Sequence, residues 1–299
     1  MATNDAAATS GTAGAFERSA SVFRESVAAG EPGRYHLYVA SACPWCHRTI
    51  IVRELMGLAP AVGISYLDPI RDARGWAFTG GKFVDEIEGM RFLAEAYVRT
   101  DPASTAHVTA PVLWDRETKR IVNNESSEII RMFESGVFGG VGPELYPAAL
   151  ASEIDAINER VYETLNDGVY RCGFARSQAA YEAAFRPLFE TLDWLEELLG
   201  SRRYLLGEQI TEADWRLFPT LVRFDAVYYS HFKCNLRRLL DYRNLWGYTR
   251  ELYQLPGIAA TVELDEIKRH YYGTHGSINP SGIVPLGPLL DFAAPHGRG

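Results

Sequence analysis

The first third of the chain alternates short apolar runs with one amphipathic stretch. Residues 34–40 (RYHLYVA) are rich in aromatic and β-branched side chains and end at small residues, which is typical of a strand that leads into a turn. Residues 49–58 place apolar side chains at the three-and-four spacing of a helix with one buried face. Residues 62–68 (VGISYLD) predict a second strand at crossover distance. These elements form a β-α-β unit.

A second group of strands follows a long connection. Residues 69–107 form this connection, and we expect a helix within it at residues 85–99. Residues 110–115 and 120–122 flank a short turn and predict a β-hairpin. Ser126, with acidic residues behind it, marks the start of another helix. The order of these elements is that of a thioredoxin-like fold.

From about residue 147 onward the pattern is helical throughout. Thr211 and Asp214 have the spacing of a capping box at the start of one helix. Apolar side chains recur about every 3.6 residues in residues 150–166, 178–199, 211–229, 236–254 and 258–271. We therefore expect an N-terminal tail or extension (1–33), an α/β thioredoxin-like domain (34–146), an all-helical domain (147–277) and an extended C-terminal segment (278–299).

Composition and charge narrow the function. Apolar residues make up 47% of the 299 residues and charged residues 23%, as in a folded globular protein. The formal net charge of −8 argues against nucleic-acid binding, which needs Lys and Arg to neutralise phosphates. No apolar run approaches the roughly 20 residues of a membrane helix. Residues 1–15 lack the features of a secretory signal and are expected to form a mobile tail. We expect a cytoplasmic protein that binds neither nucleic acid nor membranes.

Cys43 is the strongest candidate for a reactive group. Pro44 suits the first position of a helix, which places Cys43 at the N-cap. A free thiol has a pKa of about 8.5, and the unpaired N–H groups and dipole of a helix N-terminus lower it. Cys46, three residues on, can direct its N–H and S–H at the sulfur of Cys43. His47 and Arg48 are expected to add positive potential.

The CxxC spacing leaves other interpretations open. Four cysteines are too few for a disulfide framework in a chain of this size, and a CxxC pair in a non-secreted α/β protein indicates redox or metal chemistry. Neither a second CxxC nor a paired His motif supplies further zinc ligands, so no metal is expected. A buried, inert cysteine pair is the remaining alternative.

Two further motifs suit a bound peptide thiol. In thioredoxin-like proteins a cis-proline begins the third strand opposite the active cysteine, and Pro111 stands at that place; the backbone of Ala110 can then pair with a bound peptide. An ordinary trans proline is the alternative. Ser126 at a helix N-terminus offers donors to a carboxylate, and Glu125 can accept from an ammonium. This pair matches the γ-glutamyl end of glutathione, and a simple capping motif is its alternative.

These motifs and the helical second half resemble the glutathione transferase superfamily, and within it the glutathionyl-hydroquinone reductases, or Xi class. The resemblance implies glutathione as co-substrate, a glutathionyl-hydroquinone as substrate, and a homodimer formed through the helical domains. It runs over nearly the whole chain and is carried by CPWCHRT, TAPVLWD, IVNNESSEIIRMF, NDGVYRCGFA, ADWRLFPTLVRFD and IKRHYYGTHGSINPSGIVPLGP.

The resemblance also implies a reaction. The thiolate of Cys43 attacks the glutathione sulfur, the hydroquinone leaves, and a second glutathione resolves the mixed disulfide to give oxidised glutathione. An aryl carbanion is a poor leaving group, so the ring carbon must first be protonated, which requires phenolic donors. Tyr170 and Tyr271 match the family's tyrosines that face the aromatic substrate, with Tyr272 as an alternative to Tyr271, and Trp76 matches its ring-packing residue.

The resemblance thus implies two sets of binding residues. Without it, the tyrosines and Trp76 would be assigned to the core. The expected glutathione site comprises Trp76, Ala110, Pro111, Glu125 and Ser126, and the expected aromatic site comprises Trp76, Tyr170, Tyr271 and Tyr272.

The chain departs from the family pattern in three places. Many relatives carry Ala where Cys46 stands, so a disulfide between Cys43 and Cys46 stays open. The usual TVP is Thr-Ala-Pro at residues 109–111, which keeps the backbone contact and loses a side-chain contact. His107 stands where Arg is common.

Other functions also stay open. A broader glutaredoxin-like deglutathionylase, acting on mixed disulfides and dehydroascorbate, is favoured by Cys46. A non-catalytic binding module with a glutathione transferase fold is another alternative. A conjugating transferase fits less well, because a nucleophilic cysteine traps glutathione as a disulfide. Cys172 and Cys234 match no motif and are expected to take no part.

Overall fold

A four-stranded sheet forms the core of the N-terminal half. The computed structural model describes residues 9–10 and 14–298, and its sheet has the order β4-β3-β5-β6. β3 and β4 are parallel, and the other neighbours are antiparallel. This topology confirms the thioredoxin-like fold with its β-α-β unit and hairpin. The strands are β3 (Tyr35–Val39), β4 (Val62–Tyr66), β5 (Val112–Asp115) and β6 (Arg120–Asn123).

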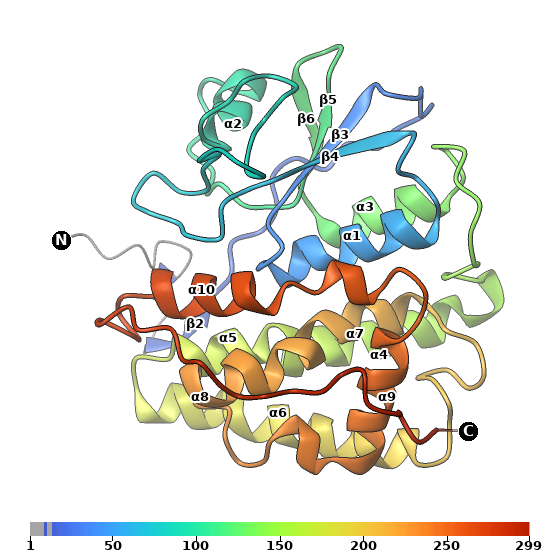
Figure 1. Ribbon diagram of the computed structural model, residues 1–299, viewed down its shortest axis with the longest axis vertical. Helices are drawn as coiled ribbons and strands as arrows, with labels where there is room; N and C mark the ends of the chain where they lie inside the picture. Colours follow the sequence, from blue (N-terminus) through green and yellow to red (C-terminus); the bar gives the residue numbers. More distant parts are fainter. Residues whose placement is uncertain (1–8, 11–13, 299) are drawn as a thin grey trace.

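Three helices accompany this sheet. α1 (Pro44–Leu55) and α3 (Ser126–Glu134) pack against each other between the sheet and the helical half, as Figure 1 shows. α2 (Ala94–Thr100) packs against β6. The predicted starts of α1 and α3 are therefore correct, and both helices begin at the boundary between the two halves.

The helix expected at residues 85–99 is confined to its last part. The Asp85 carboxylate accepts hydrogen bonds from the backbone N–H groups of Ile87, Glu88 and Met90, at 3.1, 3.2 and 2.9 Å. These bonds replace helical ones and hold the stretch in turns. Gly89 has a φ of 65°, which a right-handed helix does not tolerate. The prediction was wrong here because side-chain capping by Asp85 competes with helix formation.

The C-terminal half is helical, as expected. Two π-helical turns, Tyr162–Asn166 and Phe224–Tyr228, extend the helices that precede them, and 3₁₀ turns lie at Ala148–Leu150, Leu239–Asp241 and Ala259–Thr261. The helices are α4 (Ala151–Val161), α5 (Gly168–Gly173), α6 (Gln178–Leu199), α7 (Glu212–Arg223), α8 (Tyr229–His231), α9 (Arg243–Tyr253) and α10 (Leu264–Thr274).

The predicted helical boundaries are right in the middle of this half and wrong near its end. α6 coincides with the predicted segment, and the capping box of Thr211 and Asp214 is present. The short α5 was not predicted. α9 begins later than residue 236, because the Asp225 carboxylate accepts the N–H groups of Leu239 and Leu240 and holds that stretch outside the helix. α10 begins later than residue 258, after the 3₁₀ turn Ala259–Thr261.

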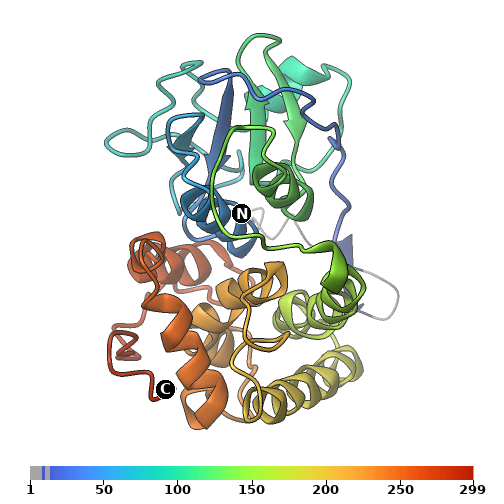
Figure 2. The same ribbon diagram turned by 90° about the vertical axis from the view of Figure 1, so that its right-hand side faces the viewer.

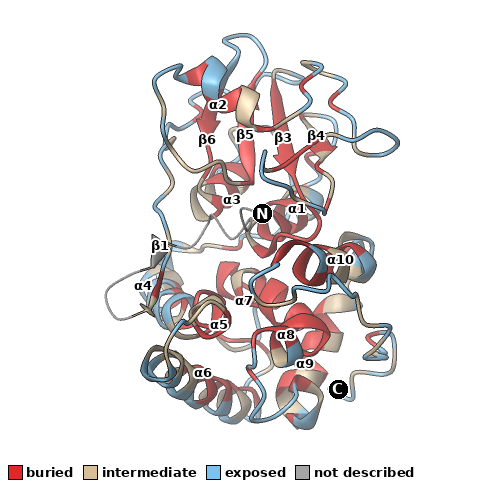
Figure 3. Cartoon of the chain, turned by 90° about the vertical axis from the view of Figure 1, so that its left-hand side faces the viewer, coloured by how far each residue is buried: buried red, intermediate tan, exposed pale blue. Residues whose placement is uncertain are grey.

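α7 joins the two halves. All of its residues except Arg216 are buried, and it packs against α1 of the other half and α4 of its own. Figure 2 shows the α/β half above the layered helices, and in Figure 3 the buried ribbon continues from the sheet through α1 into α7 and α10. No described helix is long and apolar enough to cross a membrane.

The N-terminal segment packs against both halves. β1 (Thr9–Ser10) pairs with β2 (Phe16–Glu17), and the side chain of Phe16 is buried. The Glu25 N–H donates to the Val122 carbonyl at 3.0 Å, which adds the segment to the edge of β6. The expected mobile tail, residues 1–15, lies mostly outside the described residues.

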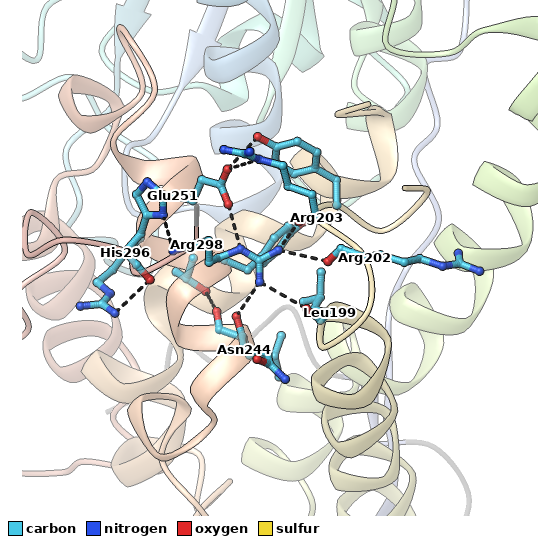
Figure 4. Close-up of polar contacts among 12 residues, drawn as sticks. Leu199, Arg202, Arg203, Asn244, Glu251, His296 and Arg298 are labelled. Carbon is cyan, nitrogen blue, oxygen red and sulfur yellow. Dashed lines mark hydrogen bonds and ion pairs between the residues drawn. The ribbon is translucent and has the colours of Figure 1, made fainter. Parts of the chain in front are cut away.

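The C-terminal segment lies extended across the helices, as predicted (Figure 1). Arg298 anchors its end: its Nε donates to the Glu251 carboxylate at 2.8 Å, and its other nitrogens donate to backbone carbonyls (Figure 4). Those carbonyls belong to Leu199, Arg202, Arg203 and Asn244.

Candidate active site

Cys43 occupies the turn between β3 and α1. Its φ and ψ of −78° and 123° are those of an N-cap residue, and Pro44 follows at the first helical position. The Cys43 sulfur accepts the backbone N–H of Cys46 at 3.4 Å and lies 3.5 Å from the Ala110 carbonyl oxygen. The predicted N-cap position is therefore confirmed, and the sulfur faces the cis-proline loop.

The surroundings of Cys43 favour the thiolate. Burial alone would raise its pKa, but the thiol and N–H of Cys46, the charge of Arg223 and the N–H of Trp45 outweigh this effect and lower the pKa from 9.0 to about 7. Burial and the neighbouring sulfur raise the pKa of Cys46 well above its ordinary value. Cys43 is thus the anionic member of the pair, and Cys46 is its hydrogen-bond donor.

The positive charge near Cys43 comes from a residue that the sequence did not single out. Arg223, at the end of α7, donates to the carbonyls of Ser41 and Ala42 at 2.8 and 3.1 Å. His47 does not contribute, because burial and Arg223 push its pKa well below 6.5 and keep it neutral. Arg48 is directed to Asn166, at 2.8 Å. The expectation that His47 and Arg48 supply the potential is therefore wrong.

The Ala110–Pro111 bond is cis, as expected. Thr109, just before it, is fixed by Tyr97, whose hydroxyl donates to the Thr109 carbonyl at 2.9 Å. Asn124 donates to the Thr109 hydroxyl at 3.1 Å and so ties the loop to the start of α3. This network presents the backbone of Ala110 to the cavity beside Cys43.

A polar pocket of about 370 Å³ adjoins this loop. Glu125 is the N-cap of α3, and its carboxylate accepts the Ser127 N–H at 3.1 Å and the Ser21 hydroxyl at 3.0 Å. Ser126 begins the helix. The pocket therefore combines an acceptor for an ammonium with donors for a carboxylate, and it is also lined by Ala110, Pro111, Arg18, Arg48, Arg216 and Tyr162.

A smaller cavity of about 100 Å³ contains Cys43 itself. Trp76 lines it and stacks on His270, with 5.0 Å between the ring centroids and 14° between the planes. Tyr170 lines it from α5. Arg18 lines both cavities: its guanidinium lies 4.6 Å from the Tyr170 ring centroid, and its Nε donates to Asp167 at 2.5 Å. Sequence reasoning missed Arg18, which belongs to the N-terminal segment.

Tyr170 is the outermost member of a row of phenols. Its hydroxyl lies 2.5 Å from that of Tyr271, which lies 3.0 Å from that of Tyr228. Burial first, and the neighbouring phenols, raise the pKa values of Tyr170 and Tyr271, so both hydroxyls keep their protons at neutral pH. Tyr271 does not line the Cys43 cavity, and it reaches that cavity through Tyr170. Tyr228, in the second π-helical turn, was not predicted.

Tyr272 does not belong to this row. Its hydroxyl bonds the Ser230 hydroxyl and lies 3.5 Å from the Ala226 carbonyl, and it does not line the Cys43 cavity. Successive residues of a helix point in directions about 100° apart, so Tyr271 and Tyr272 cannot both face the same site. Tyr272 is therefore not brought to the Cys43 cavity, and its contact with the aromatic substrate stays a prediction.

The assembled groups suit nucleophilic chemistry. A thiolate at a helix N-terminus is a strong nucleophile near neutral pH, and neutral phenols nearby are proton donors. Within residues 14–298, no group of three or more His, Cys, Asp or Glu side chains is placed to hold a metal ion. The Cys43 cavity therefore offers a nucleophile and a proton donor. The neighbouring pocket, which shares the cis-proline loop with it, offers charged and polar groups.

Comparison with known proteins agrees with this geometry. Residues 42–135 match the model of the glutathione S-transferase N-terminal domain, and residues 178–251 match that of the C-terminal domain. Glutathionyl-hydroquinone reductase PcpF of Sphingobium chlorophenolicum is 52% identical over 287 residues, covering 94% of this chain and 92% of that protein. Glutathionyl-hydroquinone reductase YqjG of Escherichia coli is 48% identical over 308 residues, covering 97% and 94%.

Solved structures give the same result. The glutathione-bound structure of YqjG, a glutathione transferase homolog from Escherichia coli K-12, has a TM-score of 0.88 at 49% identity and covers 90% of this chain and 89% of that chain. The glutathione S-transferase Xi of Phanerochaete chrysosporium has a TM-score of 0.89 at 44% identity, covering 94% and 95%. The chain therefore belongs to the glutathionyl-hydroquinone reductases, the Xi class of the glutathione transferase family.

Proposed function

We propose that this protein reduces S-glutathionyl-hydroquinones to hydroquinones, with glutathione as the co-substrate. The observation that supports this most directly is the position of Cys43. Its pKa is lowered to about 7, and the same cavity holds the phenol of Tyr170. Two relatives that span nearly the whole chain are named glutathionyl-hydroquinone reductases.

The glutathionyl group docks across both cavities. Glu125 accepts its γ-glutamyl ammonium, and the N-terminus of α3 at Ser126 receives the carboxylate on the same carbon. Arg48 and Arg216 line this pocket and add positive charge. The backbone of Ala110, next to the cis peptide bond, pairs with the cysteinyl backbone. This pose brings the glutathione sulfur to Cys43.

The reaction then proceeds by exchange at sulfur. The conjugate first takes a proton at the ring carbon that bears sulfur and gives up the proton of a ring hydroxyl, which yields the keto tautomer. The thiolate of Cys43 attacks the glutathione sulfur, the carbon–sulfur bond breaks, and its electron pair leaves with the ring as an enolate, the conjugate base of the hydroquinone. A second glutathione thiolate attacks the mixed disulfide at the glutathionyl sulfur, which releases oxidised glutathione and restores Cys43. The ring is reduced by two electrons, and two glutathione sulfurs are oxidised to a disulfide.

Tyr170 is the proton donor in this scheme. Tyr170 lines the cavity that contains Cys43, and its hydroxyl is 2.5 Å from the hydroxyl of Tyr271. A row of neutral phenols can pass a proton forward and stabilise the charge that remains on the first oxygen. Trp76 provides the flat surface against which the aromatic ring packs.

A single-turnover experiment tests this function. The protein is mixed with one equivalent of glutathionyl-hydroquinone without free glutathione, and hydroquinone and intact mass are measured. We expect one equivalent of hydroquinone and one glutathionyl adduct, mapped to Cys43 by peptide analysis. Release of hydroquinone by Cys43→Ala, or an adduct on another cysteine of the wild type, would contradict the proposal.

A dithiol deglutathionylase is the second candidate, because the thiol of Cys46 donates to the sulfur of Cys43. In that case Cys46 would displace glutathione and leave an internal disulfide. Its raised pKa disfavours this step, since the thiolate is the attacking species. Loss of two protons from the intact mass after treatment with oxidised glutathione would favour the dithiol route over the monothiol one. The homodimer and the cytoplasmic location belong to the same family-based proposal, and sedimentation velocity tests the former.

A further inference from the structure

Arg71 has no role in the scheme above, yet it lines the cavity that contains Cys43. It belongs to the loop after β4, and its guanidinium carbon lies 4.9 Å from the centroid of the Trp76 ring. The His270 ring nitrogen bonds the Pro69 carbonyl at 2.6 Å, and the Ile70 N–H donates to the Asp68 carboxylate at 2.7 Å. These two bonds pin the backbone next to Arg71, so its side chain is directed into the cavity by the fold.

Within residues 14–298, the guanidinium of Arg71 has no carboxylate as a counter-ion. Its Nε atom is shielded from solvent and has no hydrogen-bond partner within residues 14–298. No Asp or Glu is found among the described residues that line this cavity. The other guanidinium there, that of Arg18, is already paired with Asp167 at 2.5 Å. Arg71 is thus a half-buried cation whose shielded Nε donor has no partner in the part of the chain that the structure describes, an arrangement that costs free energy unless a ligand completes it.

The surrounding groups also leave the cavity positive. His107, His270 and His275 line it, and burial, reinforced by the charge of Arg71, lowers the pKa of each. These histidines therefore stay neutral and cannot offset or share the charge. The thiolate of Cys43 opposes the effect of burial on Arg71, but the sulfur is the reacting atom and is consumed in the mixed disulfide. A second anion is needed once the mixed disulfide has formed.

We propose that Arg71 binds a carboxylate of the bound substrate next to Cys43, and this inference rests on the proposed function. The planar guanidinium matches a carboxylate with two parallel hydrogen bonds. The γ-glutamyl carboxylate is assigned to the pocket of Ser126, Arg48 and Arg216, which Arg71 does not line. Two carboxylates remain as ligands: that of the glutathione glycine, and one carried by the aromatic ring of an acidic hydroquinone.

Calorimetry with unreactive thioethers distinguishes these sources. The ligands are S-phenylglutathione, its glycine amide, and an S-(carboxyphenyl)glutathione, none of which can form a disulfide with Cys43. Arg71→Met removes the charge and keeps an aliphatic side chain over Trp76, and Arg71→Lys restores a charge without the planar fork. Arg74→Met is the matched control, since Arg74 lies in the same loop, is exposed and pairs with Asp72.

Each outcome has a defined meaning. If Arg71 binds the glycine carboxylate, Arg71→Met weakens S-phenylglutathione about tenfold or more, the amide binds equally weakly to both proteins, and Arg71→Lys recovers part of the loss. If it binds a ring carboxylate, the loss appears only with the carboxyphenyl ligand. Equal affinities of wild type and Arg71→Met for all three ligands, or an equal loss for all three, would overturn the proposal. These binding data do not depend on turnover, so a failure of the proposed reaction is detected separately.

Discussion

The two pairs of cysteines in this chain show what separates a reactive thiol from an inert one. Cys43 and Cys46 are buried in the α/β half, and Cys172 and Cys234 are buried in the helical half; all four are free. Burial and the sulfur of Cys172 raise the pKa of Cys234 well above its ordinary value. In the first pair, helix N–H groups and Arg223 reverse the same burial effect at Cys43. Burial and a neighbouring thiol are common to both pairs, and what lowers the pKa of Cys43 in addition is the pair of backbone N–H groups of Cys46 and Trp45 together with Arg223.

The largest effect that this comparison predicts is a contrast between single-cysteine variants. Cys43→Ala should lower turnover of a glutathionyl-hydroquinone at least about a thousandfold, because the nucleophile is lost. Cys172→Ala and Cys234→Ala should keep turnover within about twofold and lose roughly 1 kcal/mol of unfolding free energy each, the loss typical of a small core truncation. Steady-state assays and urea melts measure both. A large loss of turnover in Cys172→Ala or Cys234→Ala would contradict the conclusion that this second pair is inert.

The next largest effect on turnover is expected for Tyr170, which lies on α5 two residues before Cys172. Tyr170→Phe should lower kcat about a hundredfold, within the range for loss of a general acid, and Tyr271→Phe should lower it less because it acts through Tyr170. Tyr272→Phe is the control, since Tyr272 follows Tyr271 in α10 and its hydroxyl is directed to Ser230. This variant should change kcat less than threefold. Equal losses in all three variants would show that the hydroxyls stabilise the fold and do not take part in proton transfer.

A smaller effect, on the reactivity of Cys43, is expected when the charge of Arg223 is removed. Arg223→Met removes the cation that lowers the pKa of Cys43, so the midpoint for alkylation should move up from about 7 by roughly one pH unit. Because the thiol is protonated below its pKa, the alkylation rate at pH 6 should fall about tenfold. Arg223→Lys keeps the charge and should retain most of the shift. A midpoint unchanged in Arg223→Met, in a protein with a normal melting profile, would exclude this explanation.

The smallest effect on turnover is expected for the Cys46 variant. Cys46→Ala removes the thiol donor but keeps the backbone N–H that lies 3.4 Å from the Cys43 sulfur. The alkylation midpoint should rise at least as far as in Arg223→Met, because the thiol of Cys46 does more than the charge of Arg223 to lower the pKa of Cys43. Turnover at saturating glutathione and pH 8 should stay within about threefold, because glutathione and not Cys46 resolves the mixed disulfide. Turnover that falls as far as in Cys43→Ala would instead support the dithiol route.

Three features of the site were predicted correctly from the sequence. The N-cap position of Cys43 follows from Pro44 and the helical pattern behind it, and the cis bond at Pro111 follows from its place after the CxxC helix. The start of α3 at Ser126 is likewise encoded by neighbouring residues. The two helix starts could be predicted because each depends on a few adjacent residues, whereas the cis bond was predicted from the order of elements in a thioredoxin-like fold.

The rest of the site depends on tertiary packing. Arg223 reaches the Cys43 turn from the far end of α7, and Arg18 reaches it from the N-terminal segment. Tyr228 joins the phenol row because a π-helical turn shifts its direction, which apolar periodicity does not reveal. Tyr271 and Tyr272 are adjacent, and only the orientation of α10 decides which one faces Tyr170. The burial that makes His47 neutral likewise depends on elements far from it in the chain, among them Arg223 of α7.

The proposed function depends on Cys43 being ionised near neutral pH, and a titration of this thiol tests that directly. The rate of alkylation by iodoacetamide is measured from pH 5 to pH 10, with the modified residue identified by mass. We expect Cys43 alone to react in the folded protein, with a rate that rises through a midpoint near pH 7 and then levels off. A midpoint at or above pH 9, or equal modification of Cys172 or Cys234, would contradict it.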